Sequence, residues 1–348
     1  MRVDELREKV RQWDSQCVAG EAIAPAKYTS ILNQIEYHAE NGWKVYLPSS
    51  HHPDFNSNYM ERLAAWVGNL TSTADQQLLL EYALHISFFS HDDFVAFYHT
   101  ALSREVSAWI VSQIGARLEP QGGKGFHQQV YQQIHHHTWF CPVTDSMDIN
   151  EFYKVNHLSG IGQRPNFAAL NMMAKTNPQT ADVWIRYMAC PDGNPLKPTL
   201  ERLVLLEDVV GSGTQCLDTV RWAAESFGKP VLFIPLILCP NGIQALRAEE
   251  QRLRGQLTVR PVLQLYRNDL LGPERQGQEG WPISQAIEEL ALRCSGRASR
   301  NMEPFGYRGT GCSLATFSNT PDNTLPIVHN RPRNGDWEPL FPRVYRGD

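Results

Sequence analysis

The chain lacks the features that mark several large classes of protein. No apolar run approaches the roughly 18 residues that a membrane-spanning helix needs. The formal net charge of -5 excludes the strongly basic overall composition of many nucleic-acid binders, although it leaves room for a local basic face. We therefore expect a soluble, cytoplasmic protein that is neither secreted nor anchored to a membrane.

Paired cysteines are also missing. The seven cysteines are scattered, odd in number and never spaced as C-x-x-C, a pattern that indicates reduced thiols in the cytosol. The triplet His135 to His137 does not supply a metal site instead, because adjacent side chains point in different directions and cannot all ligate one ion. We predict no protein-built metal site.

The first third of the chain has the pattern of helices. Leu6, Val10 and Trp13 recur at helical spacing, and residues 28–35 place a second apolar stripe on one face. Two capping arrangements predict helix starts, one at Thr73 with Gln76 and one at Ser90 with Asp93. The second of these helices is apolar over a wide arc, which predicts burial against its neighbours.

A segment rich in proline and glycine, residues 120–125, interrupts the helical pattern and predicts a linker. Without a preceding strand, its glycines are not expected to cradle a phosphate. At 348 residues, of which 42% are hydrophobic, the chain can form two domains. We predict a helical region over residues 1–120 and an α/β domain with a C-terminal extension over residues 126–348.

Short apolar runs separated by helical stretches follow the linker, which is typical of a parallel sheet with crossover helices. The fold class predicted is therefore α/β. Pro235 interrupts one run and predicts a bulge or an edge strand, because a central strand cannot spare its N–H. The predicted strands are Thr138 to Val143, Ala181 to Tyr187, Leu203 to Glu207, Pro230 to Leu238 and Leu257 to Leu265.

The strand beginning at Leu203 ends in the most informative segment of the sequence. Glu207 and Asp208 close the strand, and the small residues Gly211 to Thr214 turn the chain into a helix. In a doubly wound sheet this end of a strand faces the ligand crevice, and backbone N–H groups at the helix start form an anion site. The carboxylates can accept hydrogen bonds from sugar hydroxyls. The pattern predicts a sugar-phosphate site.

This segment resembles the signature of the type I phosphoribosyltransferases. The resemblance implies that Glu207 and Asp208 hold the ribose hydroxyls of phosphoribosyl diphosphate, acting at the catalytic centre. It also implies a loop for the 5-phosphate, made of Gly211, Ser212, Gly213, Thr214 and Gln215. The sequence departs from the salvage enzymes, because Gly211 stands where many of them carry an acid and Gln215 where they carry threonine.

Three C-terminal segments extend the likeness to one group within that superfamily. Residues 306–312 (GYRGTGC), 319–326 (NTPDNTLP) and 337–343 (WEPLFPR) resemble the phosphoribosyltransferase-like effectors of bacterial conflict systems, the PRTase-CE-like proteins of anti-phage cassettes that include some retrons. The resemblance implies a parallel sheet with flanking helices and a role in antiviral defence. The acceptor is not implied by it.

Further site residues follow from position along the chain. Thr144, Asp145 and Ser146 come directly after the first strand, where phosphoribosyltransferases keep a diphosphate-binding loop, although they can equally serve as a helix cap. Near the C-terminal segments, Tyr307, Asn319, Asn323 and His329 are the candidates for the base or acceptor side. For the segment 319–326 a plain tight loop is the competing interpretation, and for residues 337–343 packing onto the body is favoured.

Two functions from different classes fit these residues. The first is an enzyme, either a phosphoribosyltransferase or a hydrolase of a nucleotide or glycosidic bond, which binds a ribose 5-phosphate compound with Mg²⁺. The second is a binding subunit without catalysis in a defence complex, whose helical third docks a partner such as a reverse transcriptase with its DNA. The oligomeric state is not predicted.

Overall fold

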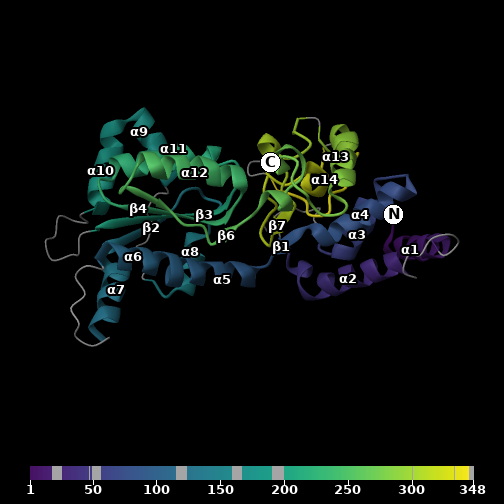
Figure 1. Cartoon of the computed structure of the whole chain (residues 1–348), viewed down its shortest axis with the longest axis horizontal. Coiled ribbons are helices and arrows are strands. Elements are labelled where there is room, and N and C mark those ends of the chain that lie inside the picture. Colours follow the sequence, from purple (N-terminus) through teal and green to yellow (C-terminus); the bar gives the residue numbers. More distant parts are fainter. Residues whose placement is uncertain are drawn as a thin grey trace. The chain divides into compact units, whose positions relative to one another are not determined.

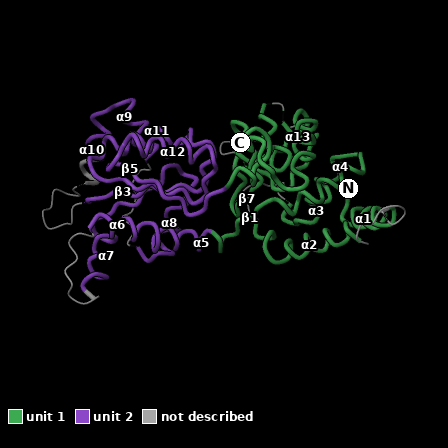
Figure 2. Tube along the Cα trace, in the orientation of Figure 1, with its two compact units in different colours: residues 1–93, 266–348 green, residues 94–265 purple. Residues whose placement is uncertain are grey.

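The computed structural model describes residues 1–17, 26–46, 48, 56–114, 124–158, 167–189, 200–299, 301–332 and 334–344. The chain divides into two compact units, residues 1–93 with 266–348 (unit 1) and residues 94–265 (unit 2), coloured separately in Figure 2. Each unit has a hydrophobic core of its own. The division predicted near residue 120 stays a prediction, since residues 115–123 lie outside the described ranges.

Unit 1 combines helices from both ends of the sequence. A short parallel pair of strands joins its two parts, with Ser87 opposite Leu314 and Phe89 opposite Thr316. Its elements are α1 (Val3–Cys17), α2 (Lys27–Asn41), η1 (Trp43–Val45), α3 (Tyr59–Gly68), α4 (Thr73–Tyr82), η2 (Ala83–His85), β1 (Ser87–Phe89), η6 (Arg267–Asp269), η7 (Gly272–Arg275), α13 (Ser284–Ala298), η8 (Tyr307–Gly309), β7 (Leu314–Thr316) and α14 (Pro326–His329).

The C-terminal segment 337–343 packs into the core of unit 1, as the sequence predicts. Trp337 and Phe341 are fully buried, and the indole N–H of Trp337 donates to the Ile327 carbonyl at 2.8 Å. The Tyr46 hydroxyl donates to the Pro342 carbonyl at 2.6 Å. The segment therefore covers apolar surface of the N-terminal helices, and the two ends of the chain fold as one unit.

Unit 2 is a parallel sheet covered by helices, which confirms the predicted fold class. The strand order is β2-β3-β4-β5, and β6 pairs with β4 beyond the end of β5. Its elements are α5 (His91–Thr100), η3 (Ala101–Val106, a π-helix), α6 (Ser107–Ile114), α7 (Lys124–His137), β2 (Thr138–Pro142), α8 (Ile149–Val155), α9 (Phe167–Thr176), α10 (Pro178–Ala189), β3 (Arg202–Val210), α11 (Thr214–Ser226), β4 (Val231–Leu238), α12 (Pro240–Arg252), β5 (Leu257–Val259) and β6 (Leu263–Gln264).

Helices cover both faces of this sheet, and the apolar strands reflect that burial. Figure 1 shows α9 to α12 on one side of the strands and α5, α6 and α8 on the other. Trp139 of β2 packs against Phe167 of α9, with ring centroids 5.1 Å apart, while its neighbour Phe140 packs against Phe152 of α8 at 5.5 Å. Successive residues thus point to opposite faces, as the pleat of a strand requires.

The predicted strand from Ala181 to Tyr187 is wrong, because these residues belong to α10. Pro178 stands at the start of this helix, where its missing N–H has no cost. Ala181 and Ile185, one helical turn apart, are buried, whereas Val183 between them is 66% exposed. The apolar spacing is that of a helix, and the run was too short to separate the two periods.

Pro235 lies inside the central strand β4, so the predicted bulge or edge is wrong. The register of β4 against β3 is the same before and after Pro235, so no extra residue is inserted there. On the side of β4 away from β3, strand pairing is interrupted between Val259 and Leu263. This interruption splits the predicted strand 257–265 into β5 and β6. The N–H and C=O of a strand residue face the same neighbour. Since the Pro235 carbonyl accepts from Val262 N at 3.0 Å, its missing N–H faces this interruption.

One of the two predicted helix caps is confirmed, and the other is displaced by one residue. Ser90 and Asp93 form a reciprocal pair at the start of α5, with Ser90 N donating to Asp93 Oδ2 at 2.7 Å and Asp93 N donating to Ser90 Oγ at 3.2 Å. At α4 the cap is Ser72, whose hydroxyl accepts from Asp75 N. Within the described ranges, every helix is too short or too polar to cross a bilayer.

Candidate functional site

The acid pair lies where β3 reaches the carboxyl edge of the sheet in unit 2. Glu207 is still paired in register with Pro235 of β4, and its side chain is only 5% exposed. Asp208 is half-buried. Because strand residues alternate, the two side chains leave the backbone of β3 in different directions. They therefore occupy different environments although they are adjacent in sequence.

The loop after β2 brings hydroxyl groups to both acids. Thr144 N donates to Glu207 Oε2 at 2.9 Å, and the Thr144 hydroxyl donates to Glu207 Oε1 at 2.5 Å. The Ser146 hydroxyl lies 3.1 Å from Glu207 Oε1 and 3.0 Å from Asp208 Oδ1, so it bridges the pair. Asp145, between them, is exposed. The structure thus places the predicted diphosphate-loop residues beside the predicted ribose acids.

Burial changes the protonation of Glu207. Removal of its carboxyl group from water, and next the charge of Asp208, raise the pKa of Glu207 to about 8, against the hydrogen bonds from Thr144 and Ser146. At neutral pH the neutral acid therefore predominates. Its proton can be shared with the Thr144 hydroxyl, which is able to accept as well as donate.

The turn that follows β3 has the form of an anion-binding helix start. Gly213 adopts φ 80°, a left-handed conformation that favours glycine, and precedes α11 without a side-chain cap. Among the described residues, the backbone N–H groups of Ser212, Gly213 and Gln215 donate no hydrogen bond. The hydroxyls of Ser212 and Thr214 lie 2.9 Å apart at this turn. These donors, with the positive end of the α11 dipole, can surround a phosphate.

A second glycine, which the sequence did not single out, fixes this turn. Gly242 N, in the first turn of α12, donates to the Gly211 carbonyl at 3.0 Å. A Cβ on Gly242 would lie 2.7 Å from that oxygen and 2.9 Å from Leu238 Cδ1. Only glycine allows α12 to come so close to the loop. The dipeptide Asn241-Gly242 after a strand is a weak signal that could have indicated this contact.

Two predicted acceptor-side residues, Asn319 and Asn323, lie in unit 1 and are engaged there. Asn319 Nδ2 donates to the Val344 carbonyl at 3.0 Å, and its Oδ1 accepts from Thr320 N at 2.9 Å. Asn323 is buried, and its Nδ2 donates to Thr310 Oγ1 at 3.1 Å. In this structure both amides serve the packing of the C-terminal segments.

The other two acceptor-side residues, also in unit 1, differ in accessibility. His329 is fully buried, and its Nε2 lies 3.1 Å from the Thr324 carbonyl oxygen. Burial, followed by the charge of Arg343, lowers the pKa of His329 to about 3, so the ring is neutral at physiological pH. Tyr307 is 44% exposed and lines a groove. Of these four candidates, Tyr307 alone presents its side chain to solvent at that level.

Comparison with known proteins places this arrangement in a family. No curated protein and no solved structure matches the chain. A family model does match, and its range includes the acid pair, the turn into α11 and the three C-terminal segments. That model, PRTase-CE, covers residues 63–343, and the chain therefore belongs to the PRTase-CE family.

Proposed function

We propose that the chain binds phosphoribosyl diphosphate, or a related ribose 5-phosphate compound, at the carboxyl edge of the sheet in unit 2. The observation that supports this most directly is the convergence of Thr144, Ser146, Glu207 and Asp208 beside the uncapped start of α11. The 5-phosphate would accept hydrogen bonds from the turn Gly211–Gln215. The sugar hydroxyls would donate to a carboxylate at the end of β3.

Glu207 and Asp208 would have different roles in this site. Glu207 is buried, and both its oxygens are already engaged by Thr144, so it is suited to hold the loop after β2 in place. Asp208 is half-buried and receives the Ser146 hydroxyl. We assign the contact with the ribose hydroxyls to Asp208, and to Glu207 the positioning of the diphosphate loop.

Magnesium fits this site as a companion of the ligand. The ion prefers oxygen ligands and is commonly held by one or two carboxylates together with substrate phosphates. Asp208 and the exposed Asp145 offer such oxygens. Among the described residues no three acidic, histidine or cysteine side chains come together to hold a metal. Magnesium would therefore arrive with the diphosphate, where it would neutralise the charge of the leaving group.

The chemistry we propose is substitution or hydrolysis at the anomeric carbon. Its transition state resembles an oxocarbenium ion, which the negative charge of Asp208 would stabilise. A second candidate is a binding subunit without catalysis. Gly211 favours it, because this position carries no side chain that could act on a base, and its carbonyl is engaged by Gly242. For either candidate we propose a role in bacterial anti-phage defence, as an effector or as part of a complex.

Calorimetric titration with phosphoribosyl diphosphate and magnesium tests the binding site. We expect the wild-type protein to bind, Asp208→Asn to weaken binding about tenfold or more, and Glu207→Ala/Asp208→Ala to abolish it. Asp182→Asn, which removes an exposed carboxylate on α10, is the matched control and should bind as the wild type does. Absence of binding by the folded wild-type protein would refute the proposal.

Turnover and cellular assays separate the two candidates. Release of diphosphate, or loss of a nucleotide in cells that express the wild-type protein but not the Glu207→Ala/Asp208→Ala variant, would identify an enzyme. Ligand binding without turnover across bases, nucleotides and nucleic acids would identify a binding subunit. Co-purification of a reverse transcriptase and its DNA at high salt would then show whether unit 1 docks that partner through an apolar interface.

A further inference from the structure

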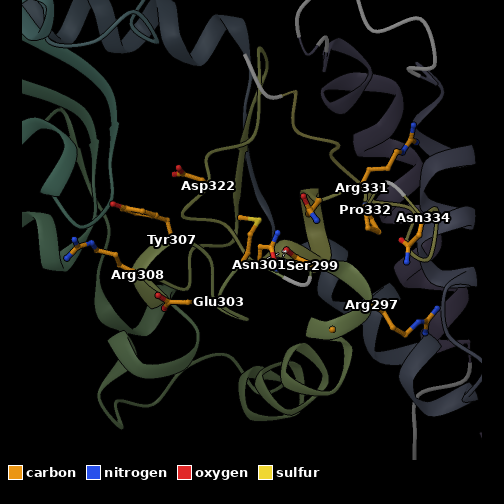
Figure 3. Close-up of a pocket in the computed structure, with 13 residues that line it drawn as sticks. Arg297, Ser299, Asn301, Glu303, Tyr307, Arg308, Asp322, Arg331, Pro332 and Asn334 are labelled. Atoms are coloured by element: carbon orange, nitrogen blue, oxygen red, sulfur yellow. Dashed lines mark hydrogen bonds between the residues drawn. The ribbon is translucent and has the colours of Figure 1, made fainter. Parts of the chain in front are cut away.

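Unit 1 contains a groove that the ribose-phosphate site does not use. Its volume is about 1390 Å³, and its lining comes from the end of α13, the loop through η8 and the segment after α14. Figure 3 shows Glu303, Tyr307, Arg308 and Asp322 at one end of this groove and Arg297, Arg331 and Asn334 toward the other. The lining thus combines an aromatic ring with cations and hydrogen-bond acceptors.

The turn that carries Tyr307 and Arg308 is held in an unusual backbone conformation. Arg308 has φ 54° and ψ 30°, a left-handed conformation that side chains other than glycine, asparagine and aspartate seldom adopt. Gly306 lies against the backbone of Asn323, where a Cβ would come within 2.6 Å of the carbonyl oxygen. Such strain persists where the surroundings impose it and is concentrated at functional sites.

Several contacts fix the turn from outside. Tyr307 N donates to the Asp322 carbonyl at 2.7 Å, and the Tyr307 carbonyl accepts from the Thr310 hydroxyl at 2.7 Å. A Cβ on Gly311 would collide with the Leu271 carbonyl oxygen. The Tyr307 ring and the Arg308 guanidinium are therefore displayed by a rigid backbone, which lowers the entropy that a ligand contact would cost.

The arginines that line the groove differ in their hydrogen bonds and ion pairs. Arg331 forms an ion pair with Glu338 at 2.7 Å. Arg297 donates to the carbonyls of Asn69 and Asp336. For Arg308 the described chain offers one contact, its guanidinium lying 5.8 Å from the centroid of the Tyr307 ring. Arg308 is therefore the lining arginine that has no hydrogen bond or ion pair among the described residues, and its donors can meet an anion.

Two hydrogen-bond acceptors, Glu303 and Asp322, line the groove at the same end as Tyr307 and Arg308. The side chain of Glu303 lies next to the turn, since its Oε2 would be 3.4 Å from a Cβ on Gly309. Asp322 is half-buried, and its carboxylate lies 3.9 Å from an Arg343 nitrogen. Carboxylates accept hydrogen bonds from the amino groups of bases, and an exposed tyrosine ring stacks on their faces.

We propose that this end of the groove binds a nucleotide whose base stacks on Tyr307 and whose phosphate meets Arg308. Glu303 and Asp322 would accept hydrogen bonds from the amino group of the base. This ligand class goes beyond the ribose-phosphate site of unit 2, and the two sites share no residue. The groove exceeds the 300 to 1000 Å³ common for small-ligand pockets, so the nucleotide can be free or part of a single strand.

Titration with two probes tests the proposal and distinguishes the sources. The probes are adenosine 5′-monophosphate and a single-stranded oligodeoxyadenylate of about six nucleotides, each measured on the full chain at fixed salt, since phosphate contacts depend on it. Tighter binding of the oligonucleotide would assign the groove to single strands, and equal binding to free nucleotides. Ribose 5-phosphate, which has no base, should not compete with either probe for the groove.

Variants of the turn provide the decisive comparison. We expect Tyr307→Ala to weaken binding of the preferred probe about tenfold and Tyr307→Phe, which keeps the ring, to leave it within about twofold. Tyr266→Ala is the matched control, because this tyrosine of unit 1 is 63% exposed. Arg308→Gly should weaken binding about tenfold while the melting temperature stays the same or rises, because glycine tolerates this backbone conformation.

Two results would overturn the proposal. One is the absence of binding by both probes at millimolar concentration. The other is binding that Tyr307→Ala and Arg308→Gly leave unchanged but that Glu207→Ala/Asp208→Ala abolishes, because the probes would then occupy unit 2. That second outcome would support the ribose-phosphate site while removing the groove, so the two proposals can fail separately.

Discussion

Glu207 shows how a buried acid can serve a binding site without carrying charge. The residue is 5% exposed, and its carboxyl group accepts hydrogen bonds from the backbone N–H and the hydroxyl of Thr144. A charged carboxylate there would lose its hydration, so the pKa of Glu207 lies well above that of an exposed glutamate. The charge of Asp208 beside it raises the pKa of Glu207 further.

The raised pKa of Glu207 predicts a pH dependence of stability. In the unfolded chain this group ionises near pH 4.5, whereas in the native protein it ionises near pH 8. Its favourable contribution is therefore complete below about pH 4.5 and is lost as the pH rises to about 8. Glu207→Gln resembles the protonated acid. Its unfolding free energy should be close to that of the wild type near pH 5 and exceed it by at least about 1 kcal/mol at pH 8.5.

Denaturant unfolding at several pH values measures this difference. The control Glu279→Gln removes an exposed carboxylate of unit 1, and its difference from the wild type should not change with pH. A constant difference between Glu207→Gln and the wild type from pH 5 to 9 would contradict the assignment of a neutral Glu207. The experiment needs no ligand, so it tests the electrostatics of the acid pair independently of function.

At the level of elements, the start of α12 determines the shape of the loop before α11. Gly242 is in contact with the carbonyl of Gly211, and a methyl group has no space between them. In Gly242→Ala the first turn of α12 must move away from the loop. We expect a loss of about 1 to 3 kcal/mol in unfolding free energy. Binding of phosphoribosyl diphosphate should weaken as well, because the N–H groups of the loop lose their common direction.

Gly125→Ala is the matched control for this variant. It adds the same methyl group in the same unit, in α7, where nothing lies within 4 Å of the new Cβ. Alanine in a helix should stabilise the protein slightly. If Gly242→Ala had the same unfolding free energy and the same ligand affinity as Gly125→Ala, α12 would have no part in forming the loop.

The sequence predicted elements where the local pattern reports a local environment. Strands such as β4 could be predicted because burial on both faces makes them continuously apolar. The turn at Gly211 to Gln215 was found because it contains glycine where the backbone is left-handed, at Gly213. The parallel pairing of β1 with β7 could not be predicted, since it joins residues more than 200 positions apart whose strands have only three residues each.

Site residues followed the same rule. The acids of β3 and the hydroxyls after β2 lie close together because β2 and β3 are neighbouring parallel strands that end at one edge of the sheet. The amides of Asn319 and Asn323 were proposed as ligand contacts from their chemistry and from the resemblance of their segment, and the structure shows them bonded to Val344 and Thr310. Residue type indicates what a side chain can do, while its partners depend on tertiary packing.

At the scale of the whole molecule, one hydrophobic core is formed by the two ends of the chain and the other by its middle. The core of unit 1 is built from residues before 87 and after 270, whereas the core of unit 2 uses residues 139–259. Trp66 of α3, for example, donates to the Ile327 carbonyl at 2.7 Å. Helices α1 to α4 therefore depend on the C-terminal segments for their burial, and unit 2 is a continuous stretch between them.

This division predicts that residues 90–265 fold without the rest of the chain. Such a chain keeps the Ser90 cap of α5, the complete five-stranded sheet and every residue of the ribose-phosphate site. It should unfold cooperatively in denaturant and bind phosphoribosyl diphosphate as the full chain does. Residues 1–93 alone should not fold, because Trp66, Tyr46 and Tyr82 would lose their C-terminal partners. A chain of residues 90–265 that is unfolded, while the full chain is stable, would mean that the core of unit 2 is insufficient by itself.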